Sequence, residues 1–127
     1  MSTKKTTKRT TSKKKSAKKA EKKKDIGIDV APPKKECSDP NCPFHGHLKV
    51  RGQIIKGRVV SESSHQTVIV ERRYLKYDQK YERSERRVSR YPAYNPRCIN
   101  ATVNSEVRIM ECRPLSKTKS FVVVEVV

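Results

Sequence analysis

The sequence predicts an all-β fold, a small five-stranded barrel with an extended basic hairpin and a disordered basic N-terminal arm. Three observations support this prediction. Runs rich in β-branched residues alternate with turn residues from about residue 48, no long apolar pattern of helical period occurs, and 127 residues suffice for one small domain. We expect the barrel domain to cover residues 36–127, after an arm and linker at residues 1–35.

The first 24 residues are strongly basic and contain little that could be buried. They hold twelve Lys or Arg residues against the single acid Glu21, within a chain whose formal net charge is +18. Such a segment buries too little apolar surface to offset its ordering entropy, so we expect it to be disordered when free. The charge favours an arm that lies along nucleic acid phosphates over a merely solubilising tail or a contact with an anionic membrane.

Five strands are expected at about residues 48–60, 65–77, 80–90, 106–113 and 120–127. Residues 61–64 should form the first turn, and residues 91–96, which contain two prolines, should form a loop. Gly52 and Gly57 interrupt the first strand and predict a bulge or bend of the kind that closes small barrels. The number of strands favours the OB-fold. Its expected core is Val50, Ile54, Val59, Val68, Val70, Val107, Ile109, Phe121 and Val123. The last strand is apolar on both faces, so alternation does not assign its inward side.

The middle of the chain is basic and rich in tyrosine. All five tyrosines fall between residues 74 and 94, and residues 71–90 hold eight Lys or Arg against four acids. Paired strands projecting beyond the barrel would place these groups on a long hairpin, where Arg and Tyr suit contacts with phosphates, sugars and bases. The alternative is an exposed hairpin with cross-strand Glu–Arg pairs and tyrosines packed on the barrel. Because the cations outnumber the acids, we favour RNA. The candidate RNA-binding residues here and nearby are Arg51, Arg72, Arg73, Lys76, Tyr77, Lys80, Arg83, Arg86, Arg87, Arg90 and Arg97.

A short segment contains two thiols and two imidazoles, the side chains of Cys37, Cys42, His45 and His47. Zinc prefers four such ligands, and the four residues between Cys37 and Cys42 are within the usual spacing of zinc-binding cysteines. Only one residue separates His45 from His47, whereas zinc-binding histidines are usually separated by three to five. Cys98 or Cys112 could supply a missing ligand. The alternative is a tight Pro-rich turn with a buried Cys42 thiol and with Phe44 inserted into the barrel. The sequence therefore requires no cofactor and leaves zinc open, and we expect the cysteines to be reduced because no export signal is present.

Other classes of protein are disfavoured by the sequence. No apolar run exceeds four residues, whereas a transmembrane helix needs about 20. The acids after residue 24 are scattered and mostly lie beside Lys or Arg, and no Ser/His/Asp arrangement or phosphate-binding glycine loop is present. We therefore expect a cytoplasmic protein that is not an enzyme and has no membrane partner or small-molecule substrate.

Residues 107–119, with the sequence VRIMECRPLSKTK, and the valine-rich end that follows resemble the small-subunit ribosomal protein seventeen family. The segments CPFHG at residues 42–46 and VRG at residues 50–52 resemble its archaeal branch. The resemblance covers about residues 36–127. It departs from the family where Asn104 and Ser105 replace the usual Gly-Asp, but Asn tolerates a left-handed backbone, so we expect the turn to be kept.

The resemblance implies an OB barrel that binds small-subunit rRNA directly, contacts neighbouring ribosomal proteins and helps the subunit to assemble for translation. It also implies that Arg113, Ser116, Lys117 and Lys119 face RNA, where the hydroxyl of Thr118 could join them as a donor to phosphate. The alternative is a mobile single-stranded RNA-binding barrel of the cold-shock or initiation-factor type. Such proteins need aromatic side chains spaced over the barrel face, whereas the tyrosines of this chain cluster in the hairpin and the loop after it.

Overall fold

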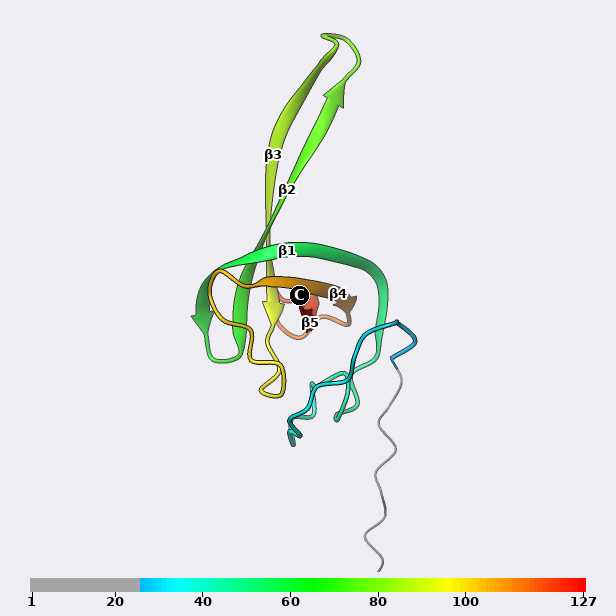
Figure 1. Cartoon of the computed structure of the whole chain (residues 1–127), viewed down its shortest axis with the longest axis vertical. Coiled ribbons are helices and arrows are strands. Elements are labelled where there is room, and N and C mark those ends of the chain that lie inside the picture. Colours follow the sequence, from blue (N-terminus) through cyan, green and yellow to red (C-terminus); the bar gives the residue numbers. More distant parts are fainter. Residues whose placement is uncertain (1–25) are drawn as a thin grey trace, which may run out of the picture.

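The computed structural model describes residues 26–127, and within this range the chain forms five strands and no helix. The strands are β1 (Val50–Ser64), β2 (Thr67–Asp78), β3 (Arg83–Tyr94), β4 (Glu106–Cys112) and β5 (Phe121–Val126). They form a closed barrel in the order β1-β2-β3-β5-β4, from which β2 and β3 project as a long hairpin (Figure 1). All neighbours are antiparallel except β3 and β5, which form a short parallel contact.

This architecture confirms the predicted all-β, five-stranded barrel with an extended hairpin. In the described part of the chain, no helix is long and apolar enough to cross a membrane. The predicted disorder of the basic arm concerns residues 1–25, which lie outside the described residues. The predicted boundary between residues 35 and 36 stays a prediction.

The prediction of a first turn at residues 61–64 is wrong. These residues extend β1, and Ser64 pairs with Thr67 across a tight turn in which Gln66 has a φ of 54°. Two register shifts interrupt the pairing of β1 with β2, after Val59 and after Glu62. Bulges of this kind allow a strand to continue through residues that do not follow a strict apolar alternation.

The prediction of a loop at residues 91–96 is also wrong, because β3 continues to Tyr94. Pro92 lies within the strand, opposite Ile69 of β2. On its other side β3 pairs with β5 only at Ala93 and Tyr94. Pro92 therefore lies where one side of β3 is unpaired, and such an edge tolerates a residue without an N–H donor.

The bulge expected at Gly52 is confirmed, and it changes which side chains of β1 point inward. Gly52 has a φ of 111°, and the pairing of β1 with β4 shifts between Val50 and Ile54. As a result Ile54 is 49% exposed while Ile55 is buried, so the prediction of Ile54 as a core residue is wrong. The turn before β4 is formed as expected, because Asn104 adopts a φ of 71°.

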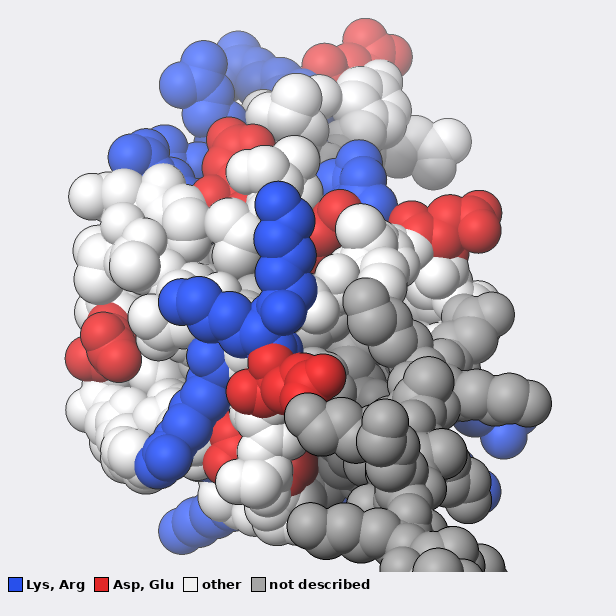
Figure 2. Space-filling model, turned by 60° about the horizontal axis from the view of Figure 1, so that its bottom comes forward, with Lys and Arg blue, Asp and Glu red and all other residues white. Residues whose placement is uncertain are grey.

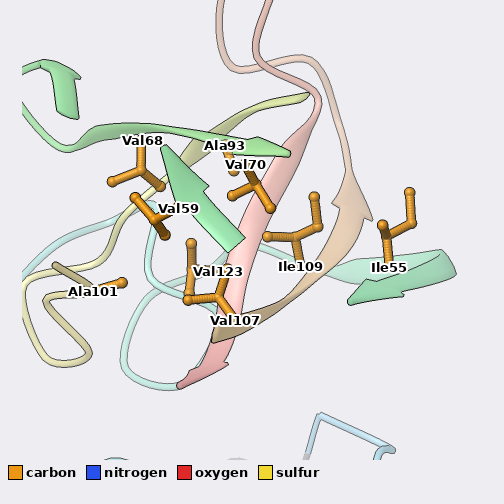
Figure 3. Close-up of a cluster of buried hydrophobic side chains, with 9 residues drawn as sticks. All are labelled: Ile55, Val59, Val68, Val70, Ala93, Ala101, Val107, Ile109 and Val123. Atoms are coloured by element: carbon orange, nitrogen blue, oxygen red, sulfur yellow. The ribbon is translucent and has the colours of Figure 1, made fainter. Parts of the chain in front are cut away.

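The barrel interior is filled by valine, isoleucine and alanine side chains that converge from all five strands and the loop before β4 (Figure 3). Six of the predicted core residues lie in it: Val59, Val68, Val70, Val107, Ile109 and Val123. Phe121 is partly buried against this interior cluster. Val50 packs instead against a second cluster outside the barrel.

The second cluster lies on the outer face of β5 and explains why that strand is apolar on both faces. Val123 points into the barrel, whereas Val122 and Val124 point outward and are also buried. The residues that cover them include Cys42, Phe44 and Leu48, together with the partly buried Ile26, Ile28 and Val30. The segment before β1 is therefore packed on the barrel, at the end of the molecule away from the hairpin tip (Figure 1).

Candidate nucleic-acid interface

The outer half of the β2–β3 hairpin presents charged and aromatic groups on both faces. Residues 71–78 of β2 pair with residues 83–90 of β3, and nearly all of their side chains are exposed. Residues directly opposite each other share a face, and alternate residues point to opposite faces. Arg72, Tyr74 and Lys76 therefore share one face with Arg87, while Arg73, Leu75 and Tyr77 share the other with Arg86.

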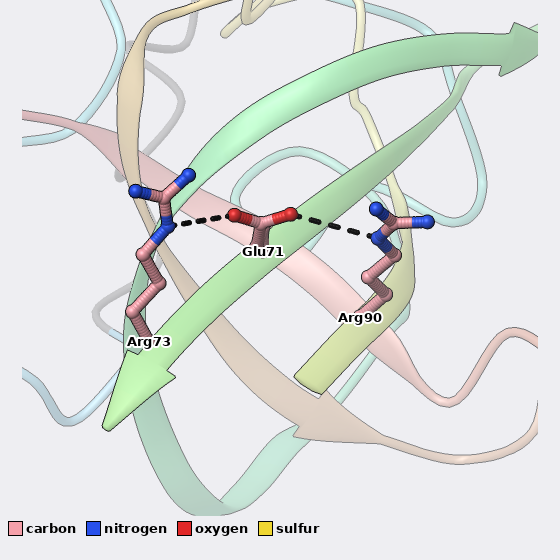
Figure 4. A network of polar contacts seen from close by, with 3 residues as sticks. All are labelled: Glu71, Arg73 and Arg90. Carbon is pink, nitrogen blue, oxygen red and sulfur yellow. Dashed lines mark hydrogen bonds and ion pairs between the residues drawn. The ribbon is translucent and has the colours of Figure 1, made fainter. Parts of the chain in front are cut away.

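Acidic residues bind some of the hairpin arginines. Glu71 lies between Arg73 and Arg90, with carboxylate–guanidinium distances of 2.8 and 3.5 Å (Figure 4). Arg87 pairs with Glu85 at 3.0 Å. The hydrogen bond from Arg73 holds the pKa of Glu71 below its usual range, with a smaller effect from Arg90. Of the predicted cross-strand Glu–Arg pairs, only that of Glu71 with Arg90 forms, because the other two pairs join residues of the same strand. All of these pairs together involve only part of the positive charge.

The remaining hairpin cations have no acidic partner. Within residues 26–127, five of them make no ion pair: Arg72, Lys76, Lys80, Arg83 and Arg86. Two of the five lie over tyrosine rings: the Arg72 guanidinium is 5.5 Å from the centre of Tyr74 and the Lys80 ammonium is 5.2 Å from that of Tyr81. Unpaired cations on a projecting ribbon can neutralise phosphates and release the counterions that surround a nucleic acid.

The loop that carries the Arg-Pro-Leu-Ser sequence, residues 113–119, is held in shape by short contacts. The Leu115 N–H donates to the carbonyl of Lys119 at 2.8 Å, and the Lys119 N–H donates to Ser116 Oγ at 3.2 Å. Leu115 also packs against the second apolar cluster. Arg113 Nη2 donates to Asn41 Oδ1 at 3.2 Å, which restrains its exposed guanidinium. Ser116, Lys117 and Thr118 are exposed on this ordered loop.

Lys119 differs from its neighbours because its ammonium is partly used within the protein. It is half-buried, donates to Thr67 Oγ1 at 3.0 Å and lies 6.0 Å from the centre of the Tyr94 ring. Burial raises the pKa of Tyr94 to about 12. These contacts fasten the 113–119 loop to the base of the β2–β3 hairpin.

A groove of about 520 Å³ runs between that loop and the hairpin base. Hydroxyl groups and two cations line it, with two apolar side chains: Ser63, Ser64, Thr67, Ile69, Arg90, Pro92, Ser116, Thr118 and Lys119. The hairpin and the 113–119 loop are far apart in the sequence, and both were predicted to bind RNA. Side chains from the two therefore line one concave surface. Long-range pairing creates this groove, and no local sequence signal points to Ser63, Ser64 or Thr67 as part of it.

Two predicted RNA-binding residues lie apart from both the hairpin and the 113–119 loop. Arg51 is exposed at the start of β1, and Arg97 is exposed in the loop after β3, where its Nη2 donates to His65 Nε2 at 3.2 Å. When the end opposite the hairpin tip is turned forward, the basic side chains form separate groups with acidic side chains between them (Figure 2).

The cysteine and histidine segment forms a compact cluster beside the second apolar cluster. One ligand atom each from Cys37, Cys42, His45 and Cys98 lies within 4.8 Å of all the others. His47, predicted as a candidate with the first three, lies outside this group and is exposed. The fourth member is instead Cys98, which the loop after β3 brings against Cys42.

Comparisons with known proteins agree with the resemblance found in residues 107–119. Residues 57–125 match the family model described as Ribosomal protein S17. The chain is similar to a protein from Methanopyrus kandleri named small ribosomal subunit protein uS17, with 67% identity over 103 residues, which are 81% of this chain and 87% of the relative.

Two further archaeal relatives carry the same name. The protein from Methanocaldococcus jannaschii is 59% identical over 80% of this chain and 87% of its own length. The protein from Methanoculleus marisnigri is 60% identical over 81% of this chain and 95% of its own length. The family match spans more than half of the chain and includes the hairpin, the groove and the 113–119 loop. The chain therefore belongs to the ribosomal protein S17 family.

Proposed function

We propose that this protein is a structural component of the small subunit of the cytoplasmic ribosome, where it binds small-subunit rRNA directly and helps it to fold. Neighbouring ribosomal proteins would be its other partners. The main support for the proposal is the groove that the hairpin base and the 113–119 loop form together, which is lined with cations and hydroxyl groups. The chain also belongs to a family of ribosomal proteins. The proposed role is non-catalytic, and no bond of the RNA is made or broken.

The barrel would act as a rigid platform for two kinds of contact. The unpaired cations of the hairpin would bind phosphates along a folded RNA, and the hydroxyls of Ser116 and Thr118 would donate to phosphate oxygens or 2′-hydroxyl groups. Arg113, restrained by Asn41, would present its planar guanidinium with little loss of side-chain entropy. Contacts of this kind recognise the shape of an RNA more than its sequence.

The position of the tyrosines supports this role over that of a mobile single-stranded RNA binder. Tyr91 packs edge-on against Phe121, with ring centres 5.2 Å apart, and Tyr94 is buried in the second cluster. The three exposed tyrosines, Tyr74, Tyr77 and Tyr81, lie on the hairpin beyond the barrel. Stacking along a single strand would need aromatic side chains spaced over the barrel face.

A matched pair of double variants tests the assignment of the 113–119 loop. The test variant is Arg113→Ala with Lys117→Ala, and the control is Lys34→Ala with Lys35→Ala, which removes the same charge from exposed positions away from the groove. Filter binding to a folded small-subunit rRNA fragment should show a loss of at least about 10-fold for the test variant and much less for the control. Thermal melts should show little change for either. Equal losses for the two variants, or no loss, would count against the loop as an RNA contact.

A further inference from the structure

We propose that Cys37, Cys42, His45 and Cys98 form a structural zinc site that fastens the segment before β1 to the loop between β3 and β4. Three ligands come from one tight segment and the fourth comes from a position 56 residues after Cys42. A metal held by all four would link parts of the chain that otherwise meet by packing and by the hydrogen bond between the thiols of Cys42 and Cys98. The proposal does not depend on RNA binding.

The separations between the ligand atoms match those around a tetrahedral zinc ion. Zn–S bonds of about 2.3 Å and Zn–N bonds of about 2.0–2.1 Å place two sulfur ligands about 3.8 Å apart and a sulfur and a nitrogen about 3.6 Å apart. His45 Nδ1 lies 3.4 Å from Cys37 Sγ and 3.6 Å from Cys42 Sγ. The sulfurs of Cys42 and Cys98 lie 3.5 Å apart. Small movements would therefore complete the coordination.

The cluster is closed and chemically suited to zinc. Cys42 and Cys98 are buried, and Cys37 and His45 are half-buried, so four protein ligands fill the site and leave no open position for a substrate. Three thiolates and one imidazole form one of the usual donor sets of structural zinc, and soft sulfur ligands disfavour magnesium or calcium.

Two of the four ligand atoms already lie against each other, and the backbone supports one of them. Cys42 Sγ and Cys98 Sγ are within hydrogen-bond distance, and either thiol can be the donor. The backbone N–H groups of His45 and Phe44 donate to Cys42 Sγ. A zinc ion would replace the proton between the two sulfurs and keep these backbone donors.

The backbone around Cys42 is folded into a tight turn that presents the ligands. The Cys42 N–H donates to the Asp39 carbonyl at 3.2 Å, and the Gly46 N–H donates to the Cys42 carbonyl at 2.9 Å. A Cβ at residue 46 would lie 2.6 Å from the Asp39 carbonyl oxygen, so only glycine fits there. The turn also explains why His45, and not His47, joins the cluster: the two residues flank Gly46, and His47 is directed outward to solvent.

The metal content of the full-length chain tests the proposal. We expect native mass spectrometry of the protein purified under reducing conditions to show one zinc per chain. After removal of the metal by a chelator, titration with Co²⁺ should give the absorption of a tetrahedral thiolate-bound ion at a ratio of one, which requires no variant. The variants Cys98→Ser and His45→Ala should reduce zinc affinity by more than the 10–100-fold that loss of an outer-shell partner costs.

Two matched variants serve as controls. Cys112→Ser removes a half-buried cysteine and His47→Ala removes an exposed histidine, and both residues lie outside the cluster. Both variants should keep one zinc per chain. Three results would overturn the proposal: no metal bound by the reduced chain, a Cys42–Cys98 disulfide in protein isolated under thiol-trapping conditions, or unchanged zinc affinity in Cys98→Ser. None of these results would bear on the ribosomal role.

Discussion

The two ends of the molecule are stabilised in opposite ways. Beyond Glu71, the strands of the β2–β3 hairpin pair only with each other within the described residues, and Leu75 and Val88 are 67% and 53% exposed there. At the other end, the segment before β1 covers the outer face of β5 and buries Cys42, Phe44 and Leu48. A two-stranded ribbon is marginally stable by itself, whereas a covered sheet face is stabilised by buried apolar area.

Because the two ends differ in this way, we expect RNA binding to depend on the hairpin and the stability of the fold to depend on the end that contains Cys42. In the described part of the chain the hairpin carries five cations without acidic partners, so these cations are available to a group from outside the chain. The end that contains Cys42 is instead packed within the protein, where Cys42, Phe44 and Leu48 are buried. We therefore expect changes on the hairpin to weaken RNA binding with little effect on folding, and changes around Cys42 to have the reverse effect.

The largest effect is expected from Phe44→Ala. Phe44 is 5% exposed in the second cluster, and loss of a buried phenyl ring typically costs about 3–5 kcal/mol of the free energy of unfolding. The control Leu75→Ala removes an apolar side chain from the exposed hairpin and should change stability by no more than about 0.5 kcal/mol. Urea unfolding of the free protein measures both. Similar losses in the two variants would show that the two ends are not stabilised differently.

The next effect is on RNA affinity. Replacing Arg72, Lys76, Arg83 and Arg86 together by Ala removes cations that have no acidic partner among residues 26–127. We expect affinity for a folded small-subunit rRNA fragment to fall by about 100-fold and the slope of log affinity against log salt to decrease by about 2–4. Filter binding over a range of salt concentrations measures this slope. An unchanged slope would mean that the hairpin does not contact phosphates.

The sequence was sufficient to predict the strands, the hairpin and most of the barrel interior. Alternation of apolar residues is a local signal, and it correctly placed Val59, Val68, Val70, Val107 and Ile109 inside. It failed at Ile54, because the bulge at Gly52 shifts the register by an amount that composition does not reveal. The expectation that prolines end a strand failed at Pro92, where an unpaired side of β3 accepts a proline.

The parts of the candidate sites that join distant residues could not be assigned from local spacing. The hairpin cations were predictable because they lie together in the sequence. Cys98 could be named only as one of two possible fourth ligands, because the path of the loop after β3 decides which cysteine reaches Cys42. The groove between the hairpin base and the 113–119 loop likewise depends on contacts such as that of Lys119 with Thr67.

A smaller effect is expected at the contact that joins the end containing Cys42 to the 113–119 loop. Asn41 lies in the turn beside Cys42 and accepts a hydrogen bond from Arg113. The variant Asn41→Ala frees the guanidinium and should weaken RNA binding by a few-fold, in line with the roughly 0.5–1.5 kcal/mol of one hydrogen bond. Gln53→Ala, at an exposed position of β1, is the matched control. If both variants bind RNA as tightly as the unaltered chain, the restraint on Arg113 does not contribute.

The smallest effect is expected at Glu71, which holds Arg73 and Arg90. Because its pKa is lowered in the folded protein, the carboxylate stabilises the fold above its unfolded pKa of about 4.3, and this stabilisation is lost as the pH falls through the folded value. Glu71→Gln should therefore melt slightly below the unaltered chain at about pH 7, and this difference should become smaller as the pH falls through the folded pKa of Glu71. It should also bind RNA slightly more tightly, because two arginines are released. A stability difference that does not become smaller at acidic pH would contradict this assignment.

Crosslinking of the assembled small ribosomal subunit tests the central claim most directly. Ultraviolet irradiation followed by mass spectrometry identifies the peptides of this chain that lie against rRNA. We predict crosslinks in the hairpin, residues 72–90, and in the loop at residues 113–119, with few from the covered segment at residues 37–48. Crosslinks confined to that segment or to the exposed part of β1, with none from the hairpin, would contradict the account.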